Sequence, residues 1–198
     1  MLQWSVEKTH SFKGEKMSNM LDRKECLLLI IDVQERLVKA LDKDVVVSKA
    51  ATLVQAAKIL EIPTILTQQY SKGLGETVEA VKKCVAPNSV IFEKSAFSAV
   101  KEKGFMETLT SFNKKQIVIC GIETHVCVHQ TASDLIAEGY EVFVVKDACA
   151  SRSKYEFKQG IERMQENGAK ISCVEIVLFE WLRSAKNPFF KEIQALIK

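Results

Sequence analysis

The 198-residue sequence lacks the features that mark several large classes of protein. No apolar run reaches the ~18 residues of a membrane-spanning helix, and the first residues lack the apolar core of a secretory signal peptide. The lysines are scattered as singles and pairs, and the formal net charge is only +3. Domains that bind nucleic acid gather their basic residues into a patch or stripe. The sequence therefore predicts neither a membrane nor a nucleic acid as a partner.

Cysteine and glycine are also absent from the patterns in which they most often carry function. The six cysteines lie mostly inside apolar runs, without the regular spacing of a disulfide framework, so we expect a cytoplasmic protein in a reducing compartment. The turn after the first apolar run reads DVQERL and contains no glycine, and neither a dinucleotide fingerprint nor a phosphate-binding loop occurs. We therefore expect no nucleotide cofactor.

The chain divides into two parts with different patterns. Residues 1–24 are polar and without periodicity, which predicts a flexible N-terminal arm. Within residues 25–198, short apolar runs alternate with stretches whose apolar residues recur at helical spacing. The runs are 26–32, 63–67, 89–93, 116–121, 141–145 and 169–174. Because strands covered on both faces are apolar throughout, this pattern predicts one α/β domain, a three-layer α/β/α sandwich around a six-stranded, mostly parallel sheet.

Polar and reactive side chains follow several of the predicted strands. An open parallel sheet binds its ligands beyond the carboxyl ends of the strands, so these residues are the first candidates for a site. They are Asp32 in IIDVQ, Gln68 and Gln69 in TQQY, Lys94 in FEKSAF, Cys127 in GIETHVC and Asp147 in KDACAS. Two acids, a base, a thiol and two amides are thus expected at one edge of the sheet.

The stretch VICGIETHVCVHQTA, residues 118–132, holds two cysteines in different settings. Cys120 lies inside an apolar run and is expected to be a small buried hydrophobic residue. Thr124 is a candidate N-cap for the following helix, which places Cys127 in its first turn. There the helix dipole favours a thiolate, and backbone N–H groups without helical partners could hold an oxyanion.

The base that would activate Cys127 is expected to come from another strand. His125 and His129 lie two residues to either side of Cys127, and residues two apart on a helix do not face each other. We therefore expect Asp32 to take the thiol proton and the charge of Lys94 to stabilise the thiolate. The two histidines have the spacing of metal ligands, but no third ligand lies nearby in sequence, so we expect them on a helix surface.

Three motifs in this order, IIDVQ, FEKSAFS and GIETHVCVHQTA, resemble those of the isochorismatase-like cysteine hydrolases. The resemblance runs from about Cys26 to the C-terminus. The stretches TQQYSKGLGETV, VKDACASRS and FKEIQALIK are similar in particular to the isochorismatase domain-containing branch. The resemblance implies the isochorismatase-like hydrolase fold and a catalytic triad of Asp32, Lys94 and Cys127.

The resemblance also implies details of the backbone next to the nucleophile. It implies a cis peptide bond in GIE, between Ile122 and Glu123, and an oxyanion hole made by the backbone N–H groups of Glu123 and Cys127. Nicotinamidases of the superfamily hold a metal with an Asp-x-His segment and further histidines, but TQQYSKGLGETVEAV contains no histidine. True isochorismatases, which cleave a vinyl ether, lack the nucleophilic cysteine. The expected activity is therefore hydrolysis of the C–N bond of a small amide, with no metal and no cofactor.

Three further residues are candidates for binding the substrate, and two other functions fit the same fold. Gln34 and Gln69 could hydrogen-bond a substrate amide, and Phe97 could form a wall of the pocket. Cys149 is the rival thiol, because it also follows a strand. The alternatives are vinyl-ether hydrolysis by acid catalysis from Asp32, and a scaffold or regulatory protein that retains the fold. Because homologous folds commonly assemble, we expect a homo-oligomer that acts on a small-molecule substrate.

Overall fold

The computed structural model describes residues 19–41 and 44–198. Within these residues, six strands form one sheet in the order β3-β2-β1-β4-β5-β6, and each neighbouring pair is parallel. The strands are β1 (Cys26–Ile31), β2 (Thr64–Gln69), β3 (Val90–Lys94), β4 (Gln116–Ile122), β5 (Glu141–Ala150) and β6 (Lys170–Ser172). They correspond to the six apolar runs, so the predicted fold class is confirmed. Strand β5 extends five residues beyond its expected end because, after a bulge, it continues to pair with β4 as far as Ile122.

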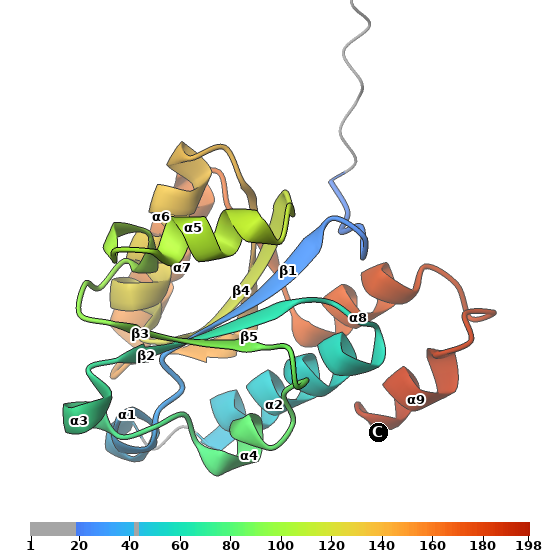
Figure 1. Ribbon diagram of the computed structural model, residues 1–198, viewed down its shortest axis with the longest axis horizontal. Helices are drawn as coiled ribbons and strands as arrows, with labels where there is room; N and C mark the ends of the chain where they lie inside the picture. The colour runs from blue at the N-terminus through green and yellow to red at the C-terminus, as the bar shows by residue number, and fades with distance from the viewer. Residues whose placement is uncertain (1–18, 42–43) are drawn as a thin grey trace, which may run out of the picture.

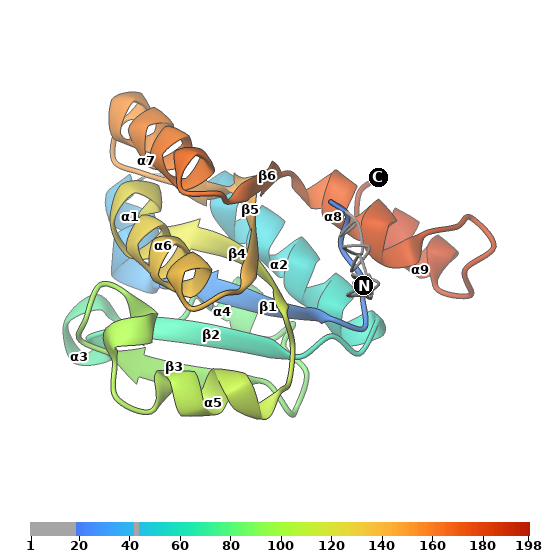
Figure 2. The same ribbon diagram turned by 90° about the horizontal axis from the view of Figure 1, so that it is seen from above.

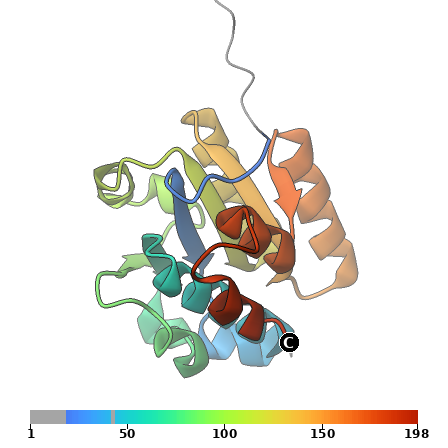
Figure 3. The ribbon, with the colours of Figure 1, turned by 90° about the vertical axis from the view of Figure 1, so that its right-hand side faces the viewer.

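Helices cover both faces of this sheet and make three layers (Figures 1 and 2). One face carries α2 (Asp44–Ile59), α4 (Glu79–Lys82), α8 (Val174–Leu182) and α9 (Phe190–Ala195). The other face carries α5 (Phe105–Ser111), α6 (His129–Ala137) and α7 (Lys154–Glu166). Figure 3 shows α8 and α9 beside α2 on the first face. In the two described ranges, none of the helices combines the length and the apolar character that crossing a bilayer requires.

Short helical segments follow the carboxyl ends of four strands. They are α1 (Glu35–Leu41) after β1, α3 (Ser71–Leu74) after β2, η1 (Ala99–Lys101) after β3, and the π-helical turn η2 (Thr124–Val128) after β4. Figure 1 shows α1 and α3 together beyond the ends of β1 and β2. This edge of the sheet is therefore the one at which a ligand site is expected.

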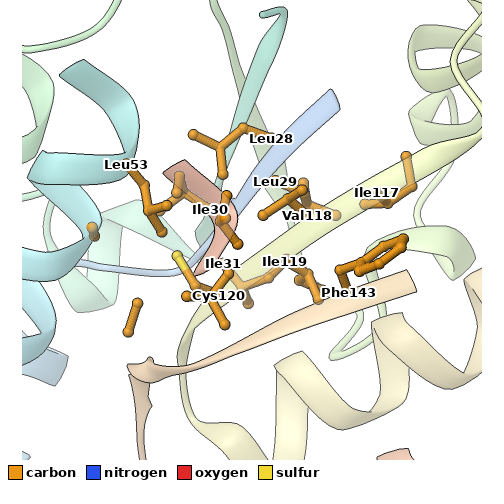
Figure 4. Close-up of a cluster of buried hydrophobic side chains, with 14 of the residues drawn as sticks. Leu28, Leu29, Ile30, Ile31, Leu53, Ile117, Val118, Ile119, Cys120 and Phe143 are labelled. Atoms are coloured by element: carbon orange, nitrogen blue, oxygen red, sulfur yellow. The ribbon is translucent and has the colours of Figure 1, made fainter. Parts of the chain in front are cut away.

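The core explains why the central strands are apolar throughout. Every residue of β1 and β4 is buried, and Figure 4 shows their side chains packed with Leu53 of α2 and Phe143 of β5. Cys120 is fully buried in this cluster, as predicted for a small hydrophobic residue. The edge strand β3 instead alternates between exposed and partly buried residues until its last residue, Lys94, which is buried. The central strands β1 and β4 are apolar throughout because helices cover both faces of the sheet and leave neither face of these strands to solvent.

The domain begins before residue 25, its predicted first residue. Leu21 is fully buried. Its backbone N–H donates to Glu180 Oε2 at 3.0 Å, and that of Asp22 donates to Gln116 Oε1 at 2.7 Å. The last residues of the predicted arm, residues 1–24, are thus packed on the domain because Leu21 contributes to its core. Residues 1–18 of that arm lie outside the described residues.

Candidate active site

The carboxyl ends of three strands bring the predicted catalytic side chains together. Asp32 follows β1, Lys94 is the last residue of β3, and Cys127 lies in η2 after β4. Lys94 Nζ lies 2.7 Å from Asp32 Oδ2, and neither side chain is exposed to solvent. The thiol of Cys127, a residue that is 7% exposed, lies against both groups. A buried carboxylate and a buried ammonium group therefore stand next to a nearly buried thiol.

Strand β2 holds the carboxylate of Asp32 in place. Thr67 Oγ1 donates to Asp32 Oδ1 at 2.6 Å, and the backbone N–H of Asp32 donates to Thr67 O at 3.2 Å. The φ of Asp32 is +50°, in the left-handed region that aspartate tolerates better than most residues. The sequence analysis missed Thr67, although a hydroxyl at the end of an apolar strand needs a buried partner and is a usable signal.

The ammonium group of Lys94 is surrounded by oxygen atoms. It donates to Gln69 Oε1 at 2.7 Å and to the backbone carbonyls of Ala96 and Phe97 at 3.2 Å each. Asp32 Oδ2 is its ion-pair partner and accepts no hydrogen bond among the described residues. The three ammonium hydrogens are thus all donated to uncharged oxygens, and the carboxylate of Asp32 lies beside them. Lys94 is therefore a fixed positive charge whose donors are all used within the protein.

The thiol of Cys127 differs from the sequence expectation in its acidity. Burial raises its pKa from the ordinary value of 9.0 to about 12, and the negative charge of Asp32 acts in the same direction. Lys94 acts in the opposite direction but does not outweigh these causes. The expected stabilisation of a thiolate by the helix dipole is thus overridden. At neutral pH the thiol keeps its proton, and Asp32 is the neighbouring group that can accept it.

Thr124 is not the N-cap that the sequence predicted. Glu123 has an extended backbone (φ −89°, ψ 143°) and is the last residue before the turn, so Thr124 is already inside η2. The carbonyl of Glu123 accepts from the N–H groups of Val126 and Val128 at 3.1 and 3.3 Å. The hydroxyl of Thr124 is buried without a hydrogen-bond partner among the described residues. The turn therefore begins one residue earlier than expected, and Cys127 still lies within it.

The connection from β4 to this turn has the backbone that the resemblance implied. The Ile122–Glu123 peptide bond is cis. Gly121, directly before it, has a φ of +130°, and a Cβ atom at this position would lie 2.0 Å from Ile31 O. Because Ile31 precedes Asp32, this close approach of β4 to β1 fixes the turn with Cys127 next to the carboxylate.

Glu123 is held by a residue that the sequence analysis did not single out. Arg152 Nη2 donates to Glu123 Oε1 at 2.6 Å, while the Nε and backbone N–H of Arg152 donate to Oε2 at 3.1 and 2.9 Å. Burial raises the pKa of Glu123, but the hydrogen bonds and charge of Arg152 outweigh this and lower it overall. The ionised side chain of Glu123 thus ties the start of η2 to the segment after β5.

The three predicted substrate contacts occupy different environments. Gln34 is fully buried; its Nε2 donates to the carbonyls of Gln69 and Gly75 at 3.1 and 2.6 Å, and its Oε1 accepts from the N–H of Gln69 at 2.8 Å. Both amide hydrogens of Gln34 are therefore used to join strand ends rather than being open to a ligand. The amide of Gln69 is divided between Lys94 and the carbonyl of Ser95. Phe97 is 55% exposed and can contact a ligand.

The two histidines flanking Cys127 have separate surroundings. His125 Nδ1 lies 3.0 Å from Ser151 Oγ. His129 has a buried Nε2 atom without a hydrogen-bond partner in the described part of the chain, and burial lowers its pKa, with the charges of Arg163 and His125 acting in the same direction. Across residues 19–41 and 44–198, no cluster of three or more His, Cys, Asp or Glu side chains has the arrangement of a metal site.

Cys149, the rival thiol, lies at a different place. Burial raises its pKa to about 12. It lines a cavity of about 250 Å³ together with Ser151 and Phe157, and the lining of this cavity does not include the Asp32–Lys94 pair. The carboxylate in this cavity is that of Asp147, which pairs with Lys49 at 3.5 Å. Both of these side chains are partly exposed, whereas the pair beside Cys127 is fully buried.

Fold and site together define a class of α/β protein with a thiol in the turn after a central strand, next to a buried ion pair. The chain belongs to the isochorismatase family, because the family model described as Isochorismatase domain matches residues 26–176. Membership of this family supports a hydrolase function.

Two related proteins extend over most of the chain. It is 39% identical over 177 residues to the secreted isochorismatase effector Isc1 of Phytophthora sojae, which covers 87% of this chain and 84% of the relative. It is also 39% identical over 178 residues to isochorismatase domain-containing protein 2 of Xenopus laevis, covering 89% of this chain and 85% of the relative. These matches support the isochorismatase domain-containing branch.

Solved structures share the fold over nearly the full chain. The structure described as MAR1 ribonuclease from Caenorhabditis elegans matches with a TM-score of 0.85 and 35% identity, over 90% of this chain and 92% of that one. The YcaC protein of Escherichia coli, described as an octameric hydrolase of unknown specificity, matches with a TM-score of 0.83 and 26% identity, over 92% and 97% of the two chains.

Proposed function

We propose that this protein is a cysteine-dependent hydrolase that cleaves the C–N bond of a small-molecule amide. In this proposal Cys127 is the nucleophile, Asp32 its base, and Lys94 the charge that stabilises developing negative charge. The observation that carries the proposal is the fully buried Asp32–Lys94 pair against the Cys127 thiol. A buried ion pair is weak evidence for stability, because desolvation offsets much of the attraction. A role in chemistry accounts for such a pair beside a nucleophile.

The first half of the reaction follows from the protonation states. Cys127 Sγ attacks the carbonyl carbon of the amide while its proton passes to Asp32, and the C=O electron pair moves onto oxygen. The backbone N–H groups of Glu123 and Cys127 donate to this oxyanion. When the oxyanion collapses, the C–N bond breaks, and the leaving nitrogen takes the proton from Asp32 and departs as an amine or ammonia.

The second half regenerates the thiol. A water molecule loses a proton to Asp32 and attacks the thioester carbonyl, which forms a second oxyanion at the same backbone N–H groups. Collapse breaks the C–S bond, the sulfur of Cys127 recovers a proton from Asp32, and a carboxylic acid is released. No step moves a proton of Lys94, whose three ammonium hydrogens are donated to Gln69, Ala96 and Phe97.

The other predicted site residues take supporting roles in this proposal. Gln69 positions the ammonium of Lys94 through its Oε1 atom. Gln34 holds the backbone of Gln69 and acts only through it. Phe97 offers an exposed ring next to a carbonyl that binds Lys94, so it contacts the substrate directly.

The proposal is tested by amide turnover in purified protein. Ammonia release from a panel of small primary carboxamides and carbamoyl compounds is measured for wild type and for Cys127→Ala, Asp32→Asn and Lys94→Met. Each variant is expected to lose at least about 10³-fold in kcat/KM, as removal of a member of a nucleophilic triad does. Cys149→Ala is the matched control and keeps its activity. Circular dichroism checks that each variant is folded.

Several outcomes would overturn the proposal. Amide turnover that survives Cys127→Ala removes the nucleophile. Cleavage of a vinyl ether that depends on Asp32 but not on Cys127 assigns acid catalysis instead. Because one structural relative is described as a ribonuclease, an oligoribonucleotide belongs in the panel, and its cleavage in preference to every small amide would replace the proposed substrate class.

Assembly and location form a separate part of the proposal. We expect a homo-oligomer, which the octameric YcaC relative supports, and light scattering coupled to size exclusion measures its mass. All six cysteines lie in the described residues and are free thiols, which supports a reducing, cytoplasmic location. Fractionation of the source cells tests this, and recovery of the protein outside the cell would contradict it.

A further inference from the structure

We propose that Tyr70 is a specificity-determining residue of this site. Together with Phe97 it forms an aromatic rim, defined here as these two side chains, that selects substrates whose acyl group is neutral and either apolar or planar. The inference rests on the proposed amide hydrolysis and names the substrate class for it.

Hydrogen bonds tie the backbones of both rim residues to Lys94. The N–H of Tyr70 donates to the carbonyl of Lys94 at 3.0 Å, and the carbonyl of Phe97 accepts from Lys94 Nζ at 3.2 Å. Both residues therefore have a fixed position relative to Lys94. Their side chains are nevertheless 60% and 55% exposed. Aromatic side chains are usually well buried, and exposed rings beside a site commonly provide contact area for a ligand.

Local geometry holds the ring of Tyr70 in one place. The φ and ψ of Tyr70 are 40° and 66°, in the left-handed region that bulky residues rarely adopt. A Cβ atom added at Gly73 would lie 2.3 and 2.4 Å from Cε1 and Cδ1 of Tyr70. The ring thus lies directly over the backbone of Gly73, and only glycine leaves room for it. A non-glycine residue in this region, close to a reactive site, points to a function that retains it.

The polar side chains around the ion pair explain why the preferred substrate is neutral. The three donors of Lys94 are used by Gln69, Ala96 and Phe97, and the amide of Gln69 is divided between Lys94 and the Ser95 carbonyl. Arg152 is bound to Glu123. A charged group on the substrate would lose its hydration without gaining one of these groups as a partner. A neutral acyl group loses little hydration free energy and gains contact with the two aromatic rings.

The test uses three alkylating probes that differ in the group they present to the site. They are iodoacetamide, the anionic iodoacetate and the aromatic N-phenyl-iodoacetamide. Peptide mass spectrometry gives the rate of each probe at Cys127 in the full-length protein, divided by its rate with N-acetylcysteine at the same pH. This ratio removes the intrinsic reactivity of each probe, and the acidity of Cys127 cancels when the ratios of two probes are compared. We expect the aromatic probe to exceed iodoacetamide by about fivefold, the scale of one aromatic contact, and iodoacetate to fall below both.

Two variants assign the preference to Tyr70. Tyr70→Leu removes the ring, and Gly73→Ala displaces it without changing Tyr70 itself. Each should reduce the aromatic preference at Cys127 by about fivefold and leave the iodoacetamide rate within about twofold. Tyr155→Leu, at a residue on α7 that is 72% exposed, is the matched control and should change neither rate.

The outcomes separate this inference from the proposed function. An aromatic preference that is absent, or that survives both variants, overturns the role of Tyr70 whatever the turnover assay shows. If iodoacetate and iodoacetamide react with Cys127 at equal rates relative to N-acetylcysteine, the neutral substrate class is overturned. Loss of assembly in Tyr70→Leu with unchanged probe ratios would assign the ring to a subunit contact instead. Amide turnover that survives Cys127→Ala overturns the proposed function itself.

Discussion

Separating Asp32 from Lys94 should cost more stability than removing both charges together. The perturbations are Asp32→Asn, Lys94→Met and the double variant. Both side chains are fully buried and their charged atoms are 2.7 Å apart. Asp32→Asn leaves an ammonium group with only the uncharged oxygens of Gln69, Ala96 and Phe97. Lys94→Met leaves a carboxylate whose remaining side-chain donors are Thr67 and the Cys127 thiol. Removing one partner of a buried pair typically costs about 3–5 kcal/mol.

The double variant leaves no buried charge at this position. Methionine has a similar length to lysine and fills the space, so we expect its free energy of unfolding within about 2 kcal/mol of wild type. The coupling between the two substitutions is then about 4 kcal/mol or more, which is a large share of the 5–15 kcal/mol that stabilises a typical domain. Restored stability should not restore activity, since both catalytic charges are gone.

Equilibrium unfolding in urea measures this coupling. The four proteins are compared at neutral pH. Where the slope of the unfolding free energy against urea concentration is the same in all four, a difference in unfolding midpoint reports a difference in stability. If a single variant does not fold, the double variant must still fold for the account to hold. Strictly additive losses would show that the pair is not coupled in the folded state, and the electrostatic description of the site would be wrong.

Three further predictions follow from contacts near the site. Gly160→Ala should destabilise the protein by about 1–3 kcal/mol and lower amide turnover, because its Cβ would lie 2.9 Å from the backbone N and Cα of His125 in η2. Gln159→Ala is the control. An unchanged urea midpoint in Gly160→Ala would contradict the close approach of the two segments. Burial raises the pKa of three thiols, Cys149 among them, to about 12 from 9.0. As the pH rises, the unfolded chain therefore releases these protons first, and the free energy of unfolding should fall between pH 9 and 12 by about 1.4 kcal/mol per pH unit for each thiol. In Cys149→Ala the free energy of unfolding, measured in urea, should fall less steeply with pH, by the contribution of one thiol. An equal dependence on pH in the two proteins would refute the raised pKa of Cys149. Dialysis against a chelator should leave amide turnover unchanged, because no step of the proposed reaction uses a metal, and activity that is lost and then restored by a metal ion would contradict that reaction.

The sheet and the three central side chains could be predicted because they depend on local pattern. Strands buried on both faces must be apolar throughout, so β1 and β4 are visible as continuous runs. Parallel strands end at the same edge, which is why Asp32, Lys94 and Cys127 could be grouped although they are far apart in sequence. The cis bond after Ile122 followed from the family resemblance and not from the residues themselves.

The remaining details depend on tertiary contacts that no local pattern contains. The acidity of Cys127 is set by burial and by Asp32, and these outweigh the helix position that the sequence suggested. The amide of Gln34 is bound by two carbonyls from other segments, and its polarity alone could not identify these partners. The packing of Leu21 against the domain is equally invisible in a polar N-terminal stretch.

The central claim, that Asp32 acts directly on the Cys127 thiol, is tested most directly by one titration. The rate of Cys127 modification by acrylamide is measured against pH, with peptide mass spectrometry, in wild type and in Asp32→Asn. Burial and Asp32 raise the wild-type pKa to about 12, so the wild-type rate should still be rising above pH 9. The Asp32→Asn rate should rise at lower pH, because the carboxylate is gone and Lys94 remains. A wild-type rate that is level by pH 9, or identical profiles for the two proteins, would contradict the account.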